Sequence, residues 1–352
     1  MRTIELQPAM VMPTESKNNN LHKARAAKND EFYTQLGDIE NELGHYKRHF
    51  NGKVVYLNCD DPYESNFFKY FALNFNHLGL RKLIATSYQT SRIARQQLGV
   101  KGRGPFKIEI TTVPDMNNDG CIDLVDIRLL LTYADNVVTP IRDGDFRSDE
   151  CIEILQEADI VVTNPPFSLF REYVTQLADY DKKFLIIGNL NAITYRDVFK
   201  LIKGNKVWLG VKHPKTFIMS DDYPLLGSSF INKEGKKVAK FGNICWFTNL
   251  SHRKRNEELI LWRAYNNADY PKYDNYDAIN VDKVKDIPMD YFDVMGVPIT
   301  FLEKYNPKQF EILDLNPHFF EMVAQGLPKP SQLRIKGQKD PYARILIKRR
   351  TS

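Results

Sequence analysis

The chain has 352 residues, 43% of them hydrophobic and 26% charged, and its four cysteines are scattered with no CxxC pair; this composition excludes a disordered or fibrous chain, a disulfide framework and a structural zinc site. No apolar run approaches the roughly 20 residues of a membrane-spanning helix, so we expect a soluble protein of the reducing cytoplasm. The net charge is +5, but residues 200–352 carry 26 Lys and Arg against 17 Asp and Glu, whereas the residues before them carry 23 against 27.

Residues 1–20 contain a short apolar stretch that is interrupted by Pro8 and Pro13 and followed by a run of Lys and Asn. A signal peptide needs an uninterrupted apolar core. We therefore interpret this segment as a flexible leader.

Short apolar runs typical of strands alternate, from residue 53 to residue 210, with segments whose apolar residues recur at helical spacing. This alternation predicts an α/β fold in which helices cover both faces of a parallel sheet. Ligands of such sheets bind beyond the carboxyl ends of the strands, so the residues that follow each strand are the candidates for chemistry. The strand-like runs are residues 53–59, 82–88, 106–113, 159–163, 183–188 and 206–210, and the helix-like segments include 64–76, 168–179 and 194–203.

Residues 115–126 have oxygen-bearing side chains at the first, third, fifth, ninth and twelfth places and a glycine, Gly120, at the sixth. This spacing resembles a calcium-binding EF-hand loop. The last place holds Asp126 where Glu is usual, one copy of the pattern occurs, and cytosolic calcium is scarce. We therefore interpret the loop as a solvated surface turn and expect the protein to need no metal.

Millimolar calcium is expected to change neither the melting temperature nor the activity of the protein, because a surface turn gains no stability from the ion. Scanning calorimetry with and without calcium measures the first quantity. A thermal upshift in calcium that disappears in Asp115→Ala would contradict the interpretation.

The most informative tetrapeptide is Asn164-Pro165-Pro166-Phe167, which directly follows a buried strand-like run. Methyl transfer to an aromatic amine needs the nitrogen lone pair freed from ring conjugation, and the Asn164 side-chain oxygen and the Pro165 carbonyl can accept the two amine hydrogens. The prolines fix φ, and Phe167 offers a face for a target base, which implies an extruded base. Asn-Pro-Pro is also an ordinary turn after a strand, but its place between a strand and a helix favours catalysis.

The tetrapeptide matches the catalytic motif of amino-methyltransferases, and residues 159–173 together resemble the EcoRI-type adenine-specific DNA methyltransferases. The likeness begins near residue 21 and covers nearly the whole remaining chain in the family's order. Further similar segments are DEFYT at 30–34, VVYLNCDDP at 54–62, SNFFKY at 65–70, YPKYDNYDAIN at 270–280 and MGVPIT at 295–300.

The resemblance implies a Rossmann-like methyltransferase core over residues 21–210 and a target DNA recognition region over residues 211–352. It implies a monomeric enzyme that transfers a methyl group from S-adenosyl-L-methionine to N6 of a flipped adenine in duplex DNA. Such an enzyme belongs to a restriction-modification system, whose endonuclease is then its partner, or is an orphan or mobile-element methylase. Two alternatives stay open: an amino-methyltransferase of RNA or protein glutamine, and a DNA-binding protein that has lost catalysis.

By the same resemblance, Phe32, Tyr33 and Thr34 pack against the methionine end of the cofactor. Taken alone, these residues are two aromatics and a hydroxyl, which are equally typical of a core. The resemblance further implies that Asp145 accepts a hydrogen bond from the adenine of the cofactor, while Phe146 packs against its ring. Taken alone, these two residues form a turn before a helix that begins near Ser148.

Asn58, Asp60 and Asp61 follow the first strand, where their side chains can meet the ammonium or ribose groups of the cofactor. Here the sequence departs from the usual methyltransferase pattern. Residues 61–66 contain no glycine, and the second strand ends in residues 86–88 without the acidic residue that commonly holds the ribose.

The basic surplus of the C-terminal part is typical of a DNA-contacting module, because neutralising phosphates supplies much of the affinity for nucleic acid. Uneven solubilising charge would give the same asymmetry. The candidate phosphate-binding residues are Arg253, Lys254 and Arg255, and Lys348, Arg349 and Arg350.

Overall fold

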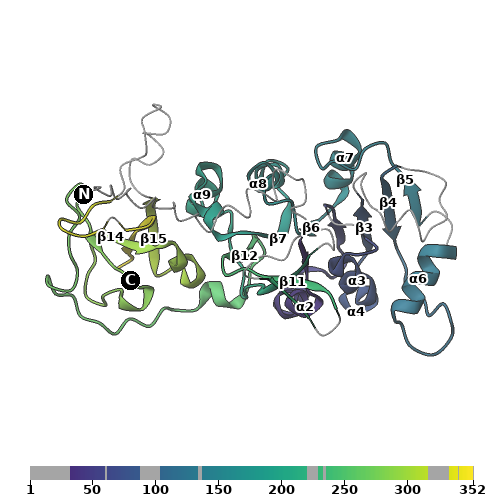
Figure 1. Ribbon diagram of the computed structural model, residues 1–352, viewed down its shortest axis with the longest axis horizontal. Coiled ribbons are helices and arrows are strands. Elements are labelled where there is room, and N and C mark those ends of the chain that lie inside the picture. Colours follow the sequence, from purple (N-terminus) through teal and green to yellow (C-terminus); the bar gives the residue numbers. More distant parts are fainter. Residues whose placement is uncertain are drawn as a thin grey trace, which may run out of the picture.

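The computed structural model describes residues 32–59, 62–87, 104–133, 137–219, 229–232, 235–315, 333–339 and 341–351. In these residues the strands form three sheets, the largest of which has eight strands flanked by helices (Figure 1). In spatial order, this central sheet consists of β5 (Val138–Pro140), β4 (Phe106–Ile110), β3 (Lys82–Thr86), β2 (Val54–Leu57), β6 (Ile160–Thr163), β7 (Lys183–Asn189), β12 (Ile244–Thr248) and β8 (Trp208–Leu209).

The middle of the central sheet is parallel: β2 pairs with β3 on one side and with β6 on the other, and β6 pairs with β7. Strands buried on both faces are continuously apolar, which is why these four were predictable. β4 runs antiparallel to β3, and β12 runs antiparallel to β7. The parallel direction predicted for residues 106–113 is therefore wrong, because a buried apolar pattern specifies the faces of a strand and not its direction.

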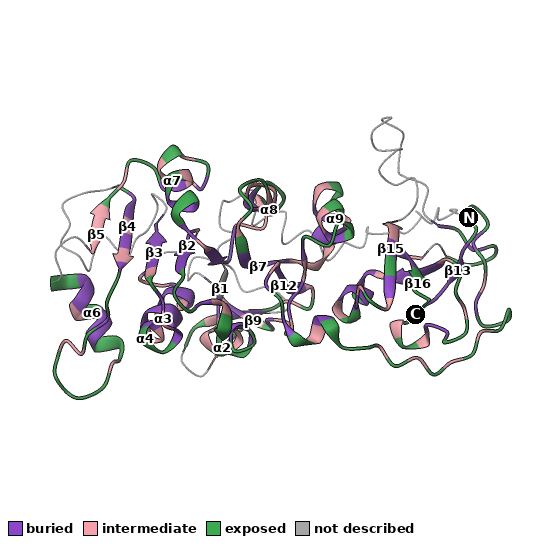
Figure 2. Cartoon of the chain, turned by 180° about the vertical axis from the view of Figure 1, so that it is seen from behind, coloured by how far each residue is buried: buried purple, intermediate pink, exposed green. Residues whose placement is uncertain are grey.

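Helices cover both faces of the central sheet, as the alternation predicted, and the buried residues lie mainly along the strands and the inner faces of the helices (Figure 2). Two of these helices begin at serine caps. Ser65 Oγ accepts the N–H groups of Phe67 and Phe68 at 3.2 and 3.4 Å, and Ser148 Oγ accepts the N–H group of Cys151 at 3.3 Å. No helix in the described part of the chain is long and apolar enough to cross a membrane. One face carries α7 (Asp149–Glu157), α8 (Phe170–Asp179) and α9 (Arg196–Lys203), and the other carries α2 (Leu36–Leu43), α3 (Asn66–Leu73), α4 (Phe75–Leu78) and α6 (Leu124–Tyr133).

A second sheet, antiparallel, joins the N-terminal strand to strands that follow the central β8. β12 then returns to the central sheet, so residues beyond the predicted boundary at Gly210 contribute to the core sheet. The second sheet has the order β1 (Phe32–Thr34), β9 (Thr216–Met219), β11 (Lys237–Lys240) and β10 (Ser229–Ile231).

The third sheet lies at one end of the elongated molecule, beside α9 (Figure 1). Most of its buried hydrophobic side chains belong to the same hydrophobic cluster as those of α7, α8 and α9, so the C-terminal region packs directly on the core. The sheet has the order β13 (Ile279–Asn280), β14 (Met295–Pro298), β16 (Arg344–Arg349) and β15 (Phe310–Leu315). Short 3-10 helices are η1 (Lys47–His49), η2 (Leu190–Thr194), η3 (Arg253–Asn256), η4 (Val284–Asp286) and η5 (Ile299–Lys304).

A buried carboxylate joins α2 to the segment that leaves the central sheet after β8. Glu42 is fully buried and accepts hydrogen bonds from the Tyr46 hydroxyl at 2.8 Å and from the main-chain N–H groups of Val211 and Lys212 at 2.8 and 2.7 Å. Burial raises the pKa of this carboxyl, whereas the three donors oppose the shift. A Cβ on Gly210 would stand 2.4 Å from Glu42 Oε1, so the chain passes this carboxylate too closely for a larger residue.

Candidate active site

The tetrapeptide that follows β6 lies at the carboxyl edge of the central sheet, where the sequence placed it. The Asn164 residue is 8% exposed. The Leu169 N–H donates to the Pro166 carbonyl at 2.9 Å, forming the turn that leads into α8. Phe167 is half-buried and packs against the hydrophobic cluster on the α2 and α3 face. The arrangement presents an amide and an aromatic ring from one short turn.

The loop after β2 is hydrogen-bonded to the end of β6, because these two parallel strands are neighbours in the sheet. The Thr163 hydroxyl donates to the main-chain carbonyl of Asn58, and the Tyr173 hydroxyl donates to Asn58 Oδ1. Asn58 is 3% exposed, and Cys59 beyond it has φ +74°, so the chain turns sharply at this edge. The predicted cofactor residue Asn58 and the predicted catalytic residue Asn164 thus lie at the same edge of the central sheet.

Phe146 lies on the same face as α8, where its ring meets the Tyr173 ring edge-on at 5.0 Å. It is 6% exposed. The neighbouring Asp145 carboxylate accepts the Nε and Nη2 groups of Arg147 at 2.8 and 2.7 Å, and these hydrogen bonds lower the pKa of Asp145. The structure therefore places Phe146 near the sheet edge that carries Asn58 and Asn164. It also keeps the carboxylate of the adjacent Asp145 ionised.

Thr34 is the last residue of β1, where it pairs with Phe217 of β9. Its main-chain carbonyl accepts the side-chain N–H of Asn66, at the start of α3, at 2.8 Å. The Thr34 side chain is buried, and its hydroxyl has no hydrogen-bond partner among the described residues. A buried hydroxyl left in this state needs a partner that the described protein atoms do not supply.

The other predicted cofactor residues are described only in part. Phe32 and Tyr33 form the backbone of β1 beside β9, and their side chains lie outside the description. Asp60 and Asp61 lie outside the described residues altogether. Their assignment stays a prediction.

The first basic run lies in η3, and its members differ in exposure. The Arg253 side chain is 95% exposed and forms an ion pair of 3.8 Å with Glu257. Lys254 Nζ donates to the Val211 carbonyl at 3.0 Å, and burial lowers the pKa of this lysine. The Arg253 charge is therefore more exposed to solvent than the Lys254 charge.

Arg255 is 9% exposed and packs inside the protein. Its guanidinium stacks on the Trp208 ring at 4.1 Å, lies 5.6 Å from the Tyr305 ring and donates to Asn205 Oδ1. Burial lowers its pKa to about 10. In this structure the Arg255 guanidinium packs between β8 and the end of η5 through these aromatic contacts.

The second basic run is the end of β16 and the residue after it. Lys348 and Arg350 are exposed. Arg349 is half-buried: its guanidinium lies 4.6 Å from the Phe292 ring and donates to the Met289 carbonyl. Two of the three charges in this run therefore face solvent.

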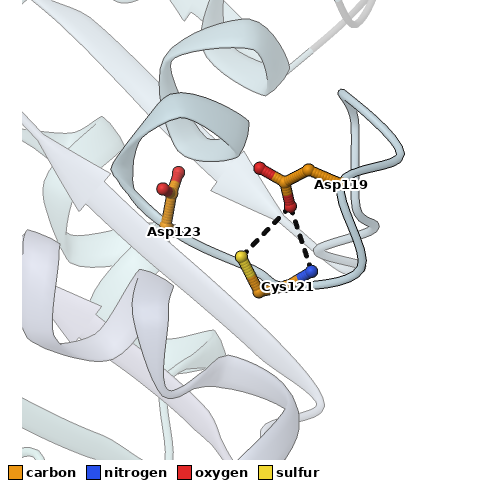
Figure 3. Close-up of side chains that lie close together, drawn as sticks. All are labelled: Asp119, Cys121 and Asp123. Carbon is orange, nitrogen blue, oxygen red and sulfur yellow. Dashed lines mark hydrogen bonds between the residues drawn. The ribbon is translucent and has the colours of Figure 1, made fainter.

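The EF-hand-like loop holds a small exposed group of candidate ligands, shown in Figure 3: the ligand atoms of Asp119, Cys121 and Asp123 all lie within 4.8 Å of one another. The Asp119 carboxylate accepts both the main-chain N–H and the thiol of Cys121, at 3.0 and 3.1 Å. Asp126 is buried and accepts the N–H groups of Met116 and Asp123 at 2.7 and 2.8 Å. The behaviour of this loop toward calcium stays a prediction.

Sequence reasoning gave Tyr173 no role beyond its place in the family-like run. Its hydroxyl and ring nevertheless contact Asn58 and Phe146. A signal was present, because Phe170, Tyr173 and Leu177 have the spacing of one buried helical face. A tyrosine on such a face usually needs a buried acceptor for its hydroxyl.

A mixed sheet with helices on both faces, and an Asn-Pro-Pro-Phe turn at its carboxyl edge, are the features of a Rossmann-like methyltransferase. The family described as "Adenine-specific methyltransferase EcoRI" matches residues 20–350. The chain therefore belongs to the EcoRI-type adenine-specific methyltransferase family, which confirms the family predicted from residues 159–173.

Three relatives match nearly end to end. The chain is 50% identical over 343 residues to the Type II methyltransferase M.EcoRI of Escherichia coli, which covers 96% of this chain and 98% of that protein. It is 39% identical over 347 residues to the Type II methyltransferase M.MgeORF184P of Mycoplasma genitalium, with 94% and 99% covered. It is 37% identical over 346 residues to the Type II methyltransferase M.MpnI of Mycoplasma pneumoniae, with 94% and 98% covered. No solved structure shows a significant match to the chain.

Proposed function

We propose that this adenine-specific methyltransferase transfers a methyl group from S-adenosyl-L-methionine to N6 of an adenine flipped out of duplex DNA, and that it acts as a monomer. Its relatives are Type II methyltransferases, which supports a place in a restriction-modification system, with a cognate endonuclease as partner. The observation that carries the proposal is the position of Asn164, nearly buried at the carboxyl edge of the sheet and followed by two prolines. A fixed acceptor there can bind an amine hydrogen as charge develops on the nitrogen.

Several features of this edge fit the proposed cofactor. The buried Thr34 hydroxyl lacks a partner among the described residues, as the wall of a ligand site would. Asn58 is held at the edge, Phe146 offers an aromatic ring, and Asp145 offers an ionised acceptor. When bound, the sulfonium of S-adenosylmethionine supplies an electrophilic methyl group. The residues proposed to hold it are Phe32, Tyr33, Thr34, Asn58, Asp60, Asp61, Asp145 and Phe146.

The substrate is tested directly by supplying purified protein and radiolabelled S-adenosylmethionine with duplex DNA, RNA or protein. Label is expected in DNA alone, and sequencing methylated bases in DNA from cells that express only this protein will give the target sequence. Label confined to RNA or protein would replace the DNA proposal with the corresponding alternative. Cofactor binding without transfer to any substrate would favour the DNA-binding protein that has lost catalysis.

We assign Phe167 to the target base. It is half-buried at the turn that carries Asn164, so part of its ring is available for stacking. Phe167→Ala is expected to lower kcat/KM about tenfold to a hundredfold, because stacking of a base on an aromatic ring is worth roughly 1–3 kcal/mol. Phe167→Tyr keeps the ring and is expected to stay active.

A fluorescent purine in place of the target adenine gives a readout of base flipping that does not depend on turnover. It is expected to brighten when wild-type protein binds and to brighten less with Phe167→Ala. Equal brightening with both proteins would remove Phe167 from the base site.

We propose that the C-terminal region supplies the phosphate contacts, with Arg253, Lys348 and Arg350 as the exposed members of the two basic runs. Lys254, Arg255 and Arg349 belong to the same proposal, although main-chain carbonyls or aromatic rings already engage their charges. Arg253 and Lys348 are the sharper tests, because Arg350 Nε also donates to the Pro307 carbonyl at 2.9 Å.

Arg253→Ala is expected to weaken DNA binding to all sequences alike and to reduce the slope of log K against log salt by about 1, because one phosphate contact is lost. Fluorescence anisotropy over a range of salt concentrations measures the slope. Arg128→Ala, an exposed arginine on α6 at the far end of the molecule from the third sheet, is the matched control and should leave it unchanged (Figure 1). The same slope for Arg253→Ala and wild type would remove the assignment.

A further inference from the structure

The helix that follows the Asn-Pro-Pro-Phe turn contacts two other segments of the proposed cofactor site. Tyr173 and Gln176 of α8 are three residues apart and therefore lie on one face of the helix. Gln176 Nε2 donates to the Phe146 carbonyl at 3.2 Å, and the Tyr173 and Phe146 rings pack edge to face at an angle of 81°. One helix thus connects the turn that carries Asn164 to Phe146.

The Tyr173 hydroxyl makes the second connection, to the loop after β2. It donates to Asn58 Oδ1, while the Thr163 hydroxyl donates to the main-chain carbonyl of the same asparagine. Tyr173 and Asn58 are 0% and 3% exposed, so water does not replace these hydrogen bonds. Both polar groups of Asn58 that accept hydrogen bonds are therefore fixed by residues that flank the catalytic turn.

We propose that Tyr173 is a positioning residue, whose hydroxyl and ring hold Asn58 and Phe146 in the arrangement that binds S-adenosylmethionine in line with Asn164. The inference rests on the proposed function, because it needs the cofactor to bind at this edge. Tyr173 does not touch the reacting atoms. It aligns two cofactor-binding segments with the turn that carries the chemistry.

The hydroxyl is tested by Tyr173→Phe, which keeps the ring beside Phe146 and leaves Asn58 Oδ1 without this donor. The Kd for S-adenosylmethionine, measured by calorimetry on the protein without DNA, is expected to rise about tenfold, because an unmade buried hydrogen bond carries a penalty of this order. The KM for the cofactor should rise similarly, whereas kcat at saturating cofactor should change less than twofold. If Tyr173 had a purely structural role, Tyr173→Phe would lower the melting temperature and leave the Kd of the folded protein for S-adenosylmethionine unchanged.

The third sheet provides a matched control with the same chemistry. Tyr273 is 5% exposed, and its hydroxyl donates to Asn280 Oδ1 at 2.8 Å, far from the catalytic turn in the sequence. Tyr273→Phe removes a buried hydrogen bond of the same type, but Asn280 Oδ1 still accepts Arg344 Nε at 3.1 Å, so the melting temperature should fall by no more than in Tyr173→Phe. Its Kd for S-adenosylmethionine should equal that of the wild type.

A second substitution separates the hydroxyl from other effects of the ring. In Asn58→Ala the acceptor is gone, so adding Tyr173→Phe should weaken cofactor binding no further. If Tyr173→Phe does not fold, Thr163→Val carries the same test, since it releases the main-chain carbonyl of Asn58 and should also raise the Kd.

The outcomes distinguish this inference from the proposed function. Failure of the wild type to bind S-adenosylmethionine would overturn the proposed function itself. Wild-type binding with an unchanged Kd in Tyr173→Phe would overturn only the positioning role, and so would a further tenfold loss when Tyr173→Phe is added to Asn58→Ala.

Discussion

Replacing Asn164 with alanine is expected to reduce methyl transfer at least about a thousandfold, while the affinities for cofactor and DNA stay within a few-fold of the wild type. The reason is that the amide is proposed to act where charge develops on the adenine nitrogen, an interaction stronger in the transition state than in the ground state. The side chain is held nearly buried at the end of β6, so a solvent molecule cannot take over its role in a fixed position. Single-turnover kinetics with preformed complex measures the chemical step alone.

Asn164→Asp is the informative companion variant, because it keeps an oxygen acceptor at the same position. It should retain more activity than Asn164→Ala. The mechanism would be abandoned if Asn164→Ala kept near-normal turnover on DNA. Equal loss of cofactor affinity and turnover would instead place Asn164 in binding.

Removal of the Glu42 carboxylate is expected to lower the free energy of unfolding by about 4 kcal/mol, because three donors lose their acceptor and each unsatisfied buried donor costs about 1–3 kcal/mol. Glu42→Ala leaves the N–H groups of Val211 and Lys212 and the Tyr46 hydroxyl without their buried acceptor. For a chain of 352 residues the melting temperature should fall by roughly 5 °C, which scanning calorimetry measures.

Glu40→Ala is the matched control, because Glu40 is exposed on the same helix. It should change the melting temperature by less than about 1 °C, as expected of a surface substitution. Glu42→Gln keeps the side-chain length and one acceptor oxygen, so its fall in melting temperature should lie between those of Glu42→Ala and Glu40→Ala. Equal melting temperatures for Glu42→Ala and Glu40→Ala would show that the segment after β8 does not depend on this carboxylate.

The parts of the fold and site that were predictable are those whose signal is local. β2 and β6 are buried along their whole length, so each reads as an apolar run. The rule that ligands bind at the carboxyl ends of parallel strands then placed Asn164 and Asn58 at one edge. The cap at Ser148 and the helix after it were likewise visible in a few consecutive residues.

The parts that were not predictable depend on partners distant in the sequence. β12 is apolar, but it follows strands of the second sheet and not a helix, so the alternation of strand and helix did not extend to it. The buried face of α8 was predictable from its spacing, whereas the acceptor for Tyr173 lies 115 residues earlier in the chain. Arg255 stands in a run of three basic residues that resembles an exposed patch, and only the tertiary packing brings Trp208 against it.

The third sheet has an order that bears on how the protein is made. β14 and β15 both pair with β16, which lies between them although it comes after both in the sequence. During synthesis, β14 can pair with β13 on one side but keeps its other edge open, and β15 lacks its sheet partner, until residues 344–349 leave the ribosome. Open edges are templates for aggregation, so this end of the molecule will depend on chaperones for longest. A nascent chain that stops before residue 344 is therefore expected to become a substrate for proteolysis, and not a partly active enzyme.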